Sequence, residues 1–183
     1  KDNLLITINL QLKKMSNNTD LIIDKLRNKA CLKQNIYKVT LESFNELKKL
    51  AQIMAEELNN KMPKDIDENV KVKYEDINEF EFRLKLSGDT LAFIMHSNIV
   101  TLPDNASMMT NDYVKEDTNR AFFGSIRVYD FLSDSFKYNR VNDAGILMAR
   151  LLINMEKHYH LDSGIKFKGL KPSLEKNELN EKR

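Results

Sequence analysis

The sequence predicts an α+β fold in which two N-terminal helices pack on one face of an antiparallel sheet of about five to six strands. Three observations predict it. Apolar residues recur at spacings of three and four up to about residue 62, the period changes to two from about residue 69, and turn residues such as Ser87-Gly88-Asp89 separate the later apolar runs. Helices followed by a run of strands are typical of α+β domains.

Two helices are expected before residue 63. Thr19 suits the N-cap of a first helix over residues 20–32, and a second helix begins at Thr40 or Ser43 and ends near Met62 because Pro63 follows. Ser43 and Glu46 have the spacing of a capping box. The second helix is expected to bury one apolar stripe, widened by two further side chains: Phe44, Leu47, Ala51, Met54 and Leu58, with Leu50 and Ile53.

Strict alternation predicts the first strands, around Val70 to Tyr74 and Phe80 to Leu86. The face opposite the apolar one carries charges and is expected to meet water: Glu79, Glu81, Arg83 and Lys85. The run from Leu91 to Leu102 is apolar on both faces, which favours a central position in the sheet.

The second half of the chain holds the remaining strands. Residues 106–119 lack periodicity and are a candidate flap, and residues 121–132 form a strand in which Gly124 marks a bulge or a close approach. Residues 133–142 form an irregular loop or a single helical turn. Residues 144–154 fit a strand or a helix; the strand is favoured because residues 154–157 can turn into a partner strand at 158–161.

Length and composition indicate one domain with flanking segments. We expect a lead-in over residues 1–18, a single domain over 19–162, and a charged tail over 163–183. The native start is either Lys1 or Met15, so the lead-in is either foreign to the domain or part of the native chain. The abundance of Lys, Asn and Ile is typical of a biased, bacterial-like genome.

Charge and cysteine content limit the partners. The net charge of +2, with both signs interspersed, gives no signal for nucleic acid, and no apolar run reaches the ~18 residues of a membrane span. Cys31 is the one cysteine, so an intramolecular disulfide is excluded and a reducing compartment, the cytoplasm, is expected.

The stretch 120–154 reverses the cation usage of the chain. The whole sequence holds 22 Lys and 7 Arg, yet this stretch has four Arg and only Lys137. Arg suits ion pairs and anion contacts that are partly withdrawn from water, because its planar fork is bidentate and weakly hydrated.

Two interpretations of this stretch stay open. In the favoured one, arginines pair with Asp130, Asp134 and Asp143 in a structural clasp that holds the loop on the sheet. In the other, the loop lines a pocket for a carboxylate, a phosphate or a nucleotide-like ligand, with these binding residues: Arg127, Tyr129, Lys137, Tyr138, Asn139, Arg140 and Asn142.

The histidines supply a separate metal hypothesis. His158 and His160 are two residues apart on an expected strand and His96 lies on another, a set that could bind zinc or iron, although surface histidines are the preferred interpretation.

Function is therefore a choice between classes. The sequence holds no P-loop, Rossmann glycine pattern, nucleophile elbow, paired CxxC or HExxH motif, and it identifies no cofactor. We expect a non-enzymatic intracellular module that binds a small anionic ligand or a protein partner through loop 127–143. The alternatives are a small metal- or carboxylate-dependent enzyme and a structural component that pairs with another copy.

Overall fold

The computed structural model describes residues 17–103 and 106–163, so nearly all of the expected lead-in and tail lies outside the described residues. The chain divides into two compact units, Lys1–Asn35 and Ile36–Arg183. In the first unit, helical residues 17–25 lead into a π-helical segment, Leu26–Ala30, where the Cys31 N–H donates to the Leu26 carbonyl. The thiol of Cys31 is exposed.

A single long helix replaces the two expected helices. Helical structure is unbroken from residue 17 to Lys61, where α2 (Cys31–Lys61) ends, so the predicted N-caps were wrong. Thr40 and Ser43 lie inside the helix, and their hydroxyls donate to the carbonyls one turn back, those of Ile36 (2.7 Å) and Val39 (2.9 Å). Both hydroxyls therefore find a hydrogen-bond acceptor within the helix. No Gly or Pro occurs between residues 32 and 43 that would end the helix.

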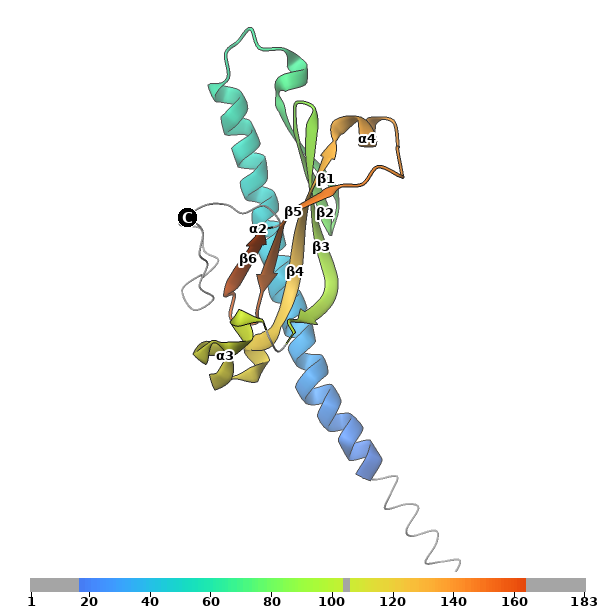
Figure 1. The fold of residues 1–183 in the computed structure, drawn as a ribbon, viewed down its shortest axis with the longest axis vertical. Helices are drawn as coiled ribbons and strands as arrows, with labels where there is room; N and C mark the ends of the chain where they lie inside the picture. Colours follow the sequence, from blue (N-terminus) through green and yellow to red (C-terminus); the bar gives the residue numbers. More distant parts are fainter. Residues whose placement is uncertain (1–16, 104–105, 164–183) are drawn as a thin grey trace, which may run out of the picture. The chain divides into compact units, whose positions relative to one another are not determined.

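The sheet is a six-stranded antiparallel meander, in the order β1-β2-β3-β4-β5-β6 (Figure 1). Its size and antiparallel pairing confirm the expected sheet, and β3 lies between β2 and β4, in the predicted central position. The favoured strand over residues 146–153 is also confirmed. The strands are β1 (Val72–Asn78), β2 (Glu81–Leu86), β3 (Asp89–Thr101), β4 (Phe122–Leu132), β5 (Ile146–Ile153) and β6 (Tyr159–Ser163).

The main core lies between α2 and one face of the sheet. The ring of Phe44 lies 5.4 Å from that of Phe82, and Phe82 stacks on Phe93 at 4.4 Å. At the C-terminal end of α2 the Asn59 amide bonds to both backbone groups of Val72, at 2.8 and 2.9 Å. These bonds fix the end of the helix on β1.

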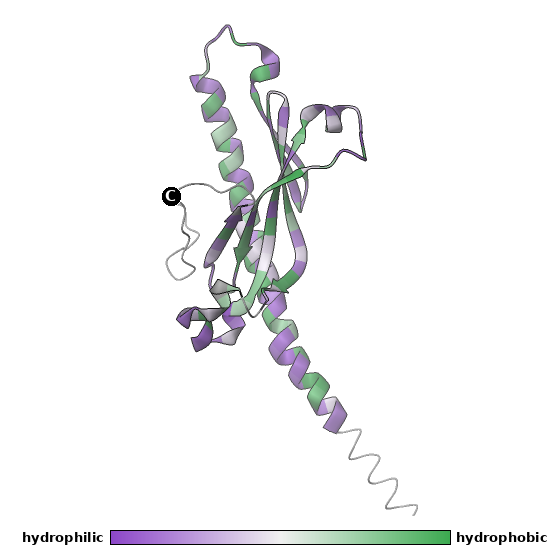
Figure 2. Ribbon diagram, in the orientation of Figure 1, coloured by the Kyte–Doolittle hydropathy of each residue, from purple (hydrophilic) through white to green (hydrophobic). Residues whose placement is uncertain are grey.

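The buried stripe of α2 differs from the predicted one. Phe44, Ala51 and Ala55 are buried, whereas four apolar side chains expected in the core are between 41% and 53% exposed: Leu50, Ile53, Met54 and Leu58. The contact line continues from Ala51 to Ala55 and Asn59, four residues at a time, so it drifts away from Met54 and Leu58. Hydrophobic residues consequently recur around α2 between hydrophilic ones (Figure 2).

The opposite face of the sheet is covered at both ends. Residues 106–119, expected as an irregular flap, hold α3 (Asp112–Glu116), which lies between two 3-10 helices, Ser107–Thr110 and Thr118–Ala121. They bury a second apolar cluster that includes Val114, Phe123 and Leu152. At the other end, α4 (Ser133–Lys137) follows β4 directly (Figure 1). None of the described helices is long and apolar enough to cross a membrane.

Candidate functional site

The loop after β4 is built on α4, as the single helical turn that the sequence allowed. The Arg140 N–H donates to the Ser135 carbonyl at 2.8 Å, and the Asp143 N–H donates to the Arg140 carbonyl at 3.1 Å. Asn139 between them adopts a left-handed backbone with φ of 49°, which Asn tolerates better than most residues. The loop is thus ordered by its own backbone bonds.

One side-chain bond closes this loop. The buried Ser135 hydroxyl donates to a carboxylate oxygen of Asp143 at 2.6 Å. The base of the loop is joined to the β2–β3 turn, because the Ser133 N–H donates to the Gly88 carbonyl at 2.7 Å and its hydroxyl shares a 2.8 Å bond with that of Thr90. The loop is therefore tied to the sheet by hydroxyl and backbone bonds.

Two aromatic rings form the floor beneath the loop. Phe131 and Phe136 meet edge to face with centroids 5.1 Å apart, and the Arg83 guanidinium lies 3.7 Å from the centre of the Phe136 ring. A Cβ at Gly145 would fall 2.3 Å from the tip of the Phe131 ring, so this glycine lets the ring lie under the chain. Arg83, expected on a solvated face, is instead largely covered, with its side chain 19% exposed.

A cavity of about 330 Å³ lies between this floor and the loop. Its wall combines apolar rings, amide and hydroxyl groups, and charges of both signs, from Arg83, Phe131, Ser135, Phe136, Asn139, Arg140, Val141 and Asp143. Polar groups in small number above an apolar floor are typical of ligand pockets.

The two arginines that line the cavity differ in whether a carboxylate pairs with their charge. Arg83 donates from Nε to the Glu81 carboxylate at 2.7 Å, so its charge is already paired. The Arg140 guanidinium lies 5.4 Å from the centre of the Tyr138 ring and pairs with no carboxylate of the described residues. Arg140 is therefore the cation that remains available to a ligand.

The structure gathers only part of the predicted ligand set. Asn139 and Arg140 line the cavity, whereas the exposed Lys137, Tyr138 and Asn142 do not. The ammonium of Lys137 lies 5.1 Å from the Tyr138 ring. Arg127 and Tyr129 lie on β4 outside the cavity lining, where the guanidinium Nη1 and the phenol oxygen are 3.5 Å apart.

The Arg/Asp clasp takes a different form from the one expected. Within residues 17–103 and 106–163, no ion pair joins an arginine to Asp130, Asp134 or Asp143. Asp143 does close the loop, but through Ser135. Asp134 is exposed in the first turn of α4.

Asp130 is the carboxylate with the most unfavourable surroundings in this region. One of its oxygens is buried and has no hydrogen-bond partner in the part of the chain that the structure describes. Burial raises the pKa of Asp130 above its usual range, and the neighbouring carboxylate of Asp89 raises it further.

The three histidines do not come together. His96 on β3 lies opposite Ser125, and His160 on β6 lies opposite Leu152, whereas His158 contacts the Tyr113 ring at 5.0 Å. The described part of the chain contains no group of three metal-ligating residues of the His, Cys, Asp or Glu type. Burial lowers the pKa of both His96 and His160.

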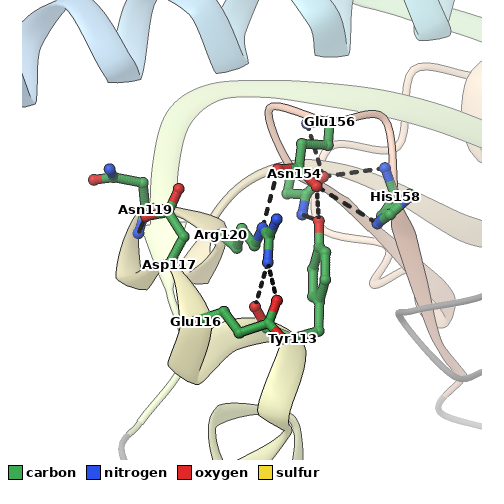
Figure 3. Close-up of polar contacts among 8 residues, drawn as sticks. All are labelled: Tyr113, Glu116, Asp117, Asn119, Arg120, Asn154, Glu156 and His158. Carbon is green, nitrogen blue, oxygen red and sulfur yellow. Dashed lines mark hydrogen bonds and ion pairs between the residues drawn. The ribbon is translucent and has the colours of Figure 1, made fainter.

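A polar network at the other end of the sheet was missed by the sequence reasoning (Figure 3). Its centre is Asn154, which is fully buried: its side-chain oxygen accepts from the backbone N–H groups of Glu156 and His158, and its amide donates to the Tyr113 hydroxyl at 2.8 Å. Tyr113 in turn donates to the Glu156 carboxylate at 2.6 Å.

Arg120 completes the network. Its Nε donates to Glu156 at 3.0 Å, and its Nη1 donates to the Tyr113 carbonyl at 2.9 Å and to Glu116 at 3.1 Å. Burial and the bond to Glu156 raise the pKa of Tyr113 to about 12, and the bond from Tyr113 lowers the pKa of Glu156. These groups satisfy one another's hydrogen-bonding capacity. Their bonds join α3 to the turn between β5 and β6.

In the sequence, Tyr113, Arg120 and Glu156 look like ordinary surface residues, and their spacing along the chain gives no sign that they form a network. Comparison with protein-family models, curated proteins and solved structures finds no match to this chain.

Proposed function

We propose that this chain is a non-enzymatic binding module for a small anionic ligand, which it holds in the cavity under the loop that follows β4. The observation that carries the proposal is Arg140, which lines a cavity with an aromatic floor and has no carboxylate partner among the described residues. A guanidinium in this setting suits a carboxylate or phosphate, which it can bind with two parallel hydrogen bonds.

The remaining wall defines the rest of the ligand. A volume of about 330 Å³ is at the small end of the range for ligand pockets. The rings of Phe131 and Phe136 suit an apolar or flat group. Asp143 accepts a bond from Ser135 and repels a second anion, so a donor of the ligand is expected on that side.

The hydrogen bonding of Tyr113 and Glu156, two groups with shifted pKa values, supports the proposal that the chain is not an enzyme. Tyr113, with its pKa of about 12, and Glu156 bond to each other and to Arg120 or Asn154. General acid–base catalysis needs a proton-transfer atom that can reach a substrate. In this network those atoms are already engaged.

The test uses native mass spectrometry of the purified full chain and of Arg140→Ala. The expected result is a bound small molecule in the native chain that is absent from Arg140→Ala, while the free energy of unfolding of the variant stays within about 0.5 kcal/mol of the native value. Lys137→Ala is the matched control, because Lys137 is exposed beside the cavity but does not line it.

Three outcomes would contradict the proposal. They are a native chain without bound ligand even after incubation with small carboxylates and phosphates, a ligand that persists in Arg140→Ala, and equal loss of ligand in Lys137→Ala. A loss of stability above about 1 kcal/mol in Arg140→Ala would instead indicate the structural role of this arginine.

The exposed apolar side chains of α2 favour a second candidate, a structural component that pairs with another copy. Leu50, Ile53, Met54 and Leu58 are each at least 41% exposed on the same part of the helix. A clustered apolar surface of this kind is typical of interaction sites. Light scattering of the full chain tests it: a dimer that Met54→Glu converts to a monomer supports it, and a native monomer at high concentration contradicts it.

A further inference from the structure

The face of the sheet that points away from α2 carries a second set of basic groups. A Cβ at Gly124 would fall 1.9 Å from the Thr40 hydroxyl of α2, so Gly124 faces the helix. Successive strand residues point to opposite faces, which places Ser125, Arg127 and Tyr129 on the other side. None of these three residues belongs to the lining of the loop cavity.

Two arginines stand directly opposite each other on this face. Arg127 of β4 pairs in register with Arg150 of β5. Opposed residues of an antiparallel pair have Cβ atoms roughly 4.5–5.5 Å apart, and like charges in this position destabilise the sheet. The pair therefore has an unfavourable interaction that an anion between the two forks would reverse.

The neighbouring carboxylates leave one of these charges uncompensated. The cross-strand row reads Glu81, Ile94, Arg127, Arg150 and Asp162. Asp162 accepts from Arg150 at 2.7 Å. Glu81 accepts from Arg83, so the one side-chain partner of Arg127 among the described residues is the phenol of Tyr129, at the limiting distance of 3.5 Å.

Three polar atoms of this region are also unsatisfied. Within residues 17–103 and 106–163, the Nε atoms of Arg127 and Arg150 and the hydroxyl of Ser125 are buried and find no hydrogen-bond partner, and Ser125 is only 1% exposed. A buried donor left without a partner costs about 1–3 kcal/mol. Three such atoms on one small patch are unusual, because buried polar groups in native proteins are nearly always bonded.

We infer that the Arg127–Arg150 pair is a binding site for a tetrahedral oxyanion, phosphate or a phosphate monoester, placed between the two guanidinium groups on the face of the sheet opposite α2. Such an anion presents separate oxygens to the two forks, which gives Arg127 a charged acceptor and Arg150 a second one beside Asp162. The site is independent of the loop cavity and of Arg140, so it goes beyond the function proposed above.

The flanking histidines supply a local readout. His96 lies diagonal to Arg127 across β3 and β4, and His160 lies diagonal to Arg150 across β5 and β6. Burial lowers the pKa of each imidazole, and Arg127 lowers that of His96 further. At His160 the carboxylate of Asp162 opposes this lowering of the pKa, and Arg150 adds to it. A bound dianion opposes the effect of the arginines, so it is expected to raise both pKa values.

Calorimetric titration of the full chain with inorganic phosphate, and separately with phenyl phosphate, tests the site at low ionic strength. Saturable binding of one anion per chain is expected, with at least a tenfold weaker affinity in Arg127→Gln. Lys73→Gln is the matched control, since Lys73 is an exposed cation at the far edge of the same sheet whose loss changes the net charge equally. Its affinity is expected within twofold of the native value. Tighter binding of phenyl phosphate would identify a monoester as the ligand, and equal binding would identify the free anion.

Heats without saturation, an unchanged affinity in Arg127→Gln, or an equal loss in Lys73→Gln would each overturn the inference. Arg140→Ala is expected to bind phosphate normally, so failure of the loop cavity and failure of this site are distinguishable. If Arg127→Gln does not fold, histidine titration of the native chain by NMR replaces it. Phosphate is then expected to raise the pKa of His96 and His160, and an absent shift would overturn the site.

Discussion

Gly124 of β4 lies directly under Thr40 of α2, so closely that a Cβ on the glycine would fall 1.9 Å from the threonine hydroxyl oxygen and 2.7 Å from its Cβ. The close approach anticipated for this glycine is thus present between the helix and the sheet. Thr40 is fully buried, and its hydroxyl bonds to the Ile36 carbonyl of its own helix, so it has no room to move aside. The side chain of Thr40 therefore packs directly on the backbone of β4 at Gly124.

Gly124→Ala is expected to lower the free energy of unfolding by about 2–3 kcal/mol, since the added methyl group forces α2 away from β4. The same change at Gly88 is the control, because nothing lies within 4 Å of its added Cβ. Chemical denaturation measures both. Thr40→Ala should relieve part of the clash, so a double variant as unstable as the sum of the single variants would contradict the contact.

Asn154→Ala is expected to cost about 2–4 kcal/mol, because it leaves the buried N–H groups of Glu156 and His158 without their shared acceptor. Tyr113→Phe should cost less, about 1–2 kcal/mol, since it removes one hydroxyl and leaves the turn intact. Thermal unfolding gives the order of the two. A larger loss in Tyr113→Phe would show that the network is centred on the phenol.

The Tyr113–Glu156 bond predicts a pH dependence of stability at both extremes. The folded pKa of Glu156 lies below its usual value, so its contribution is present above about pH 4.5 and is lost as pH falls through the folded pKa. The folded pKa of Tyr113 is raised from 10.0 to about 12, so its contribution is complete below pH 10 and is lost as pH rises through about 12.

Tyr113→Phe separates this contribution from the rest of the titration. The variant is expected to show a flatter loss of stability between pH 10 and 12 than the native chain, and a smaller loss below pH 4.5. Denaturant melts across both ranges measure the difference. If the stability of the two proteins changes with pH in parallel, the Tyr113–Glu156 bond does not cause the loss of stability at either extreme of pH.

Asp130→Asn is expected to stabilise the chain at pH 7 by about 0.5 kcal/mol or more, because it removes a partly buried charge beside Asp89. The raised folded pKa of Asp130 means that the native carboxylate becomes more costly as pH rises through it. The gain from Asn should therefore shrink as pH falls through this pKa. Destabilisation at pH 7 would show that Asp130 has a partner that its ionised form requires.

The strands with alternating apolar and polar residues were predictable, because alternation reports directly on which face of a strand is buried. The strand over residues 146–153 was favoured only because a turn and a partner strand follow it, and the order of the strands in the sheet was not predicted. Asn139 and Arg140 of the cavity were also within reach, since a short polar loop with a lone local Arg enrichment is visible in the chain itself. The predicted helix break before Thr40 was wrong because Thr and Ser are also tolerated inside a helix, where their hydroxyls bond to carbonyls one turn back.

The α+β class and the antiparallel sheet could be read from the sequence, because both depend on local periodicity, and the small size of Gly124 marked it for a bulge or a close approach. The three-dimensional fold was needed to show the order of the strands, which face of α2 meets the sheet, that Asp143 closes its loop through Ser135, and that Arg127 lies opposite Arg150. These relationships depend on cross-strand register and on the path of the helix over the twisted sheet. Both are set by contacts between residues far apart in the chain, which no local pattern encodes.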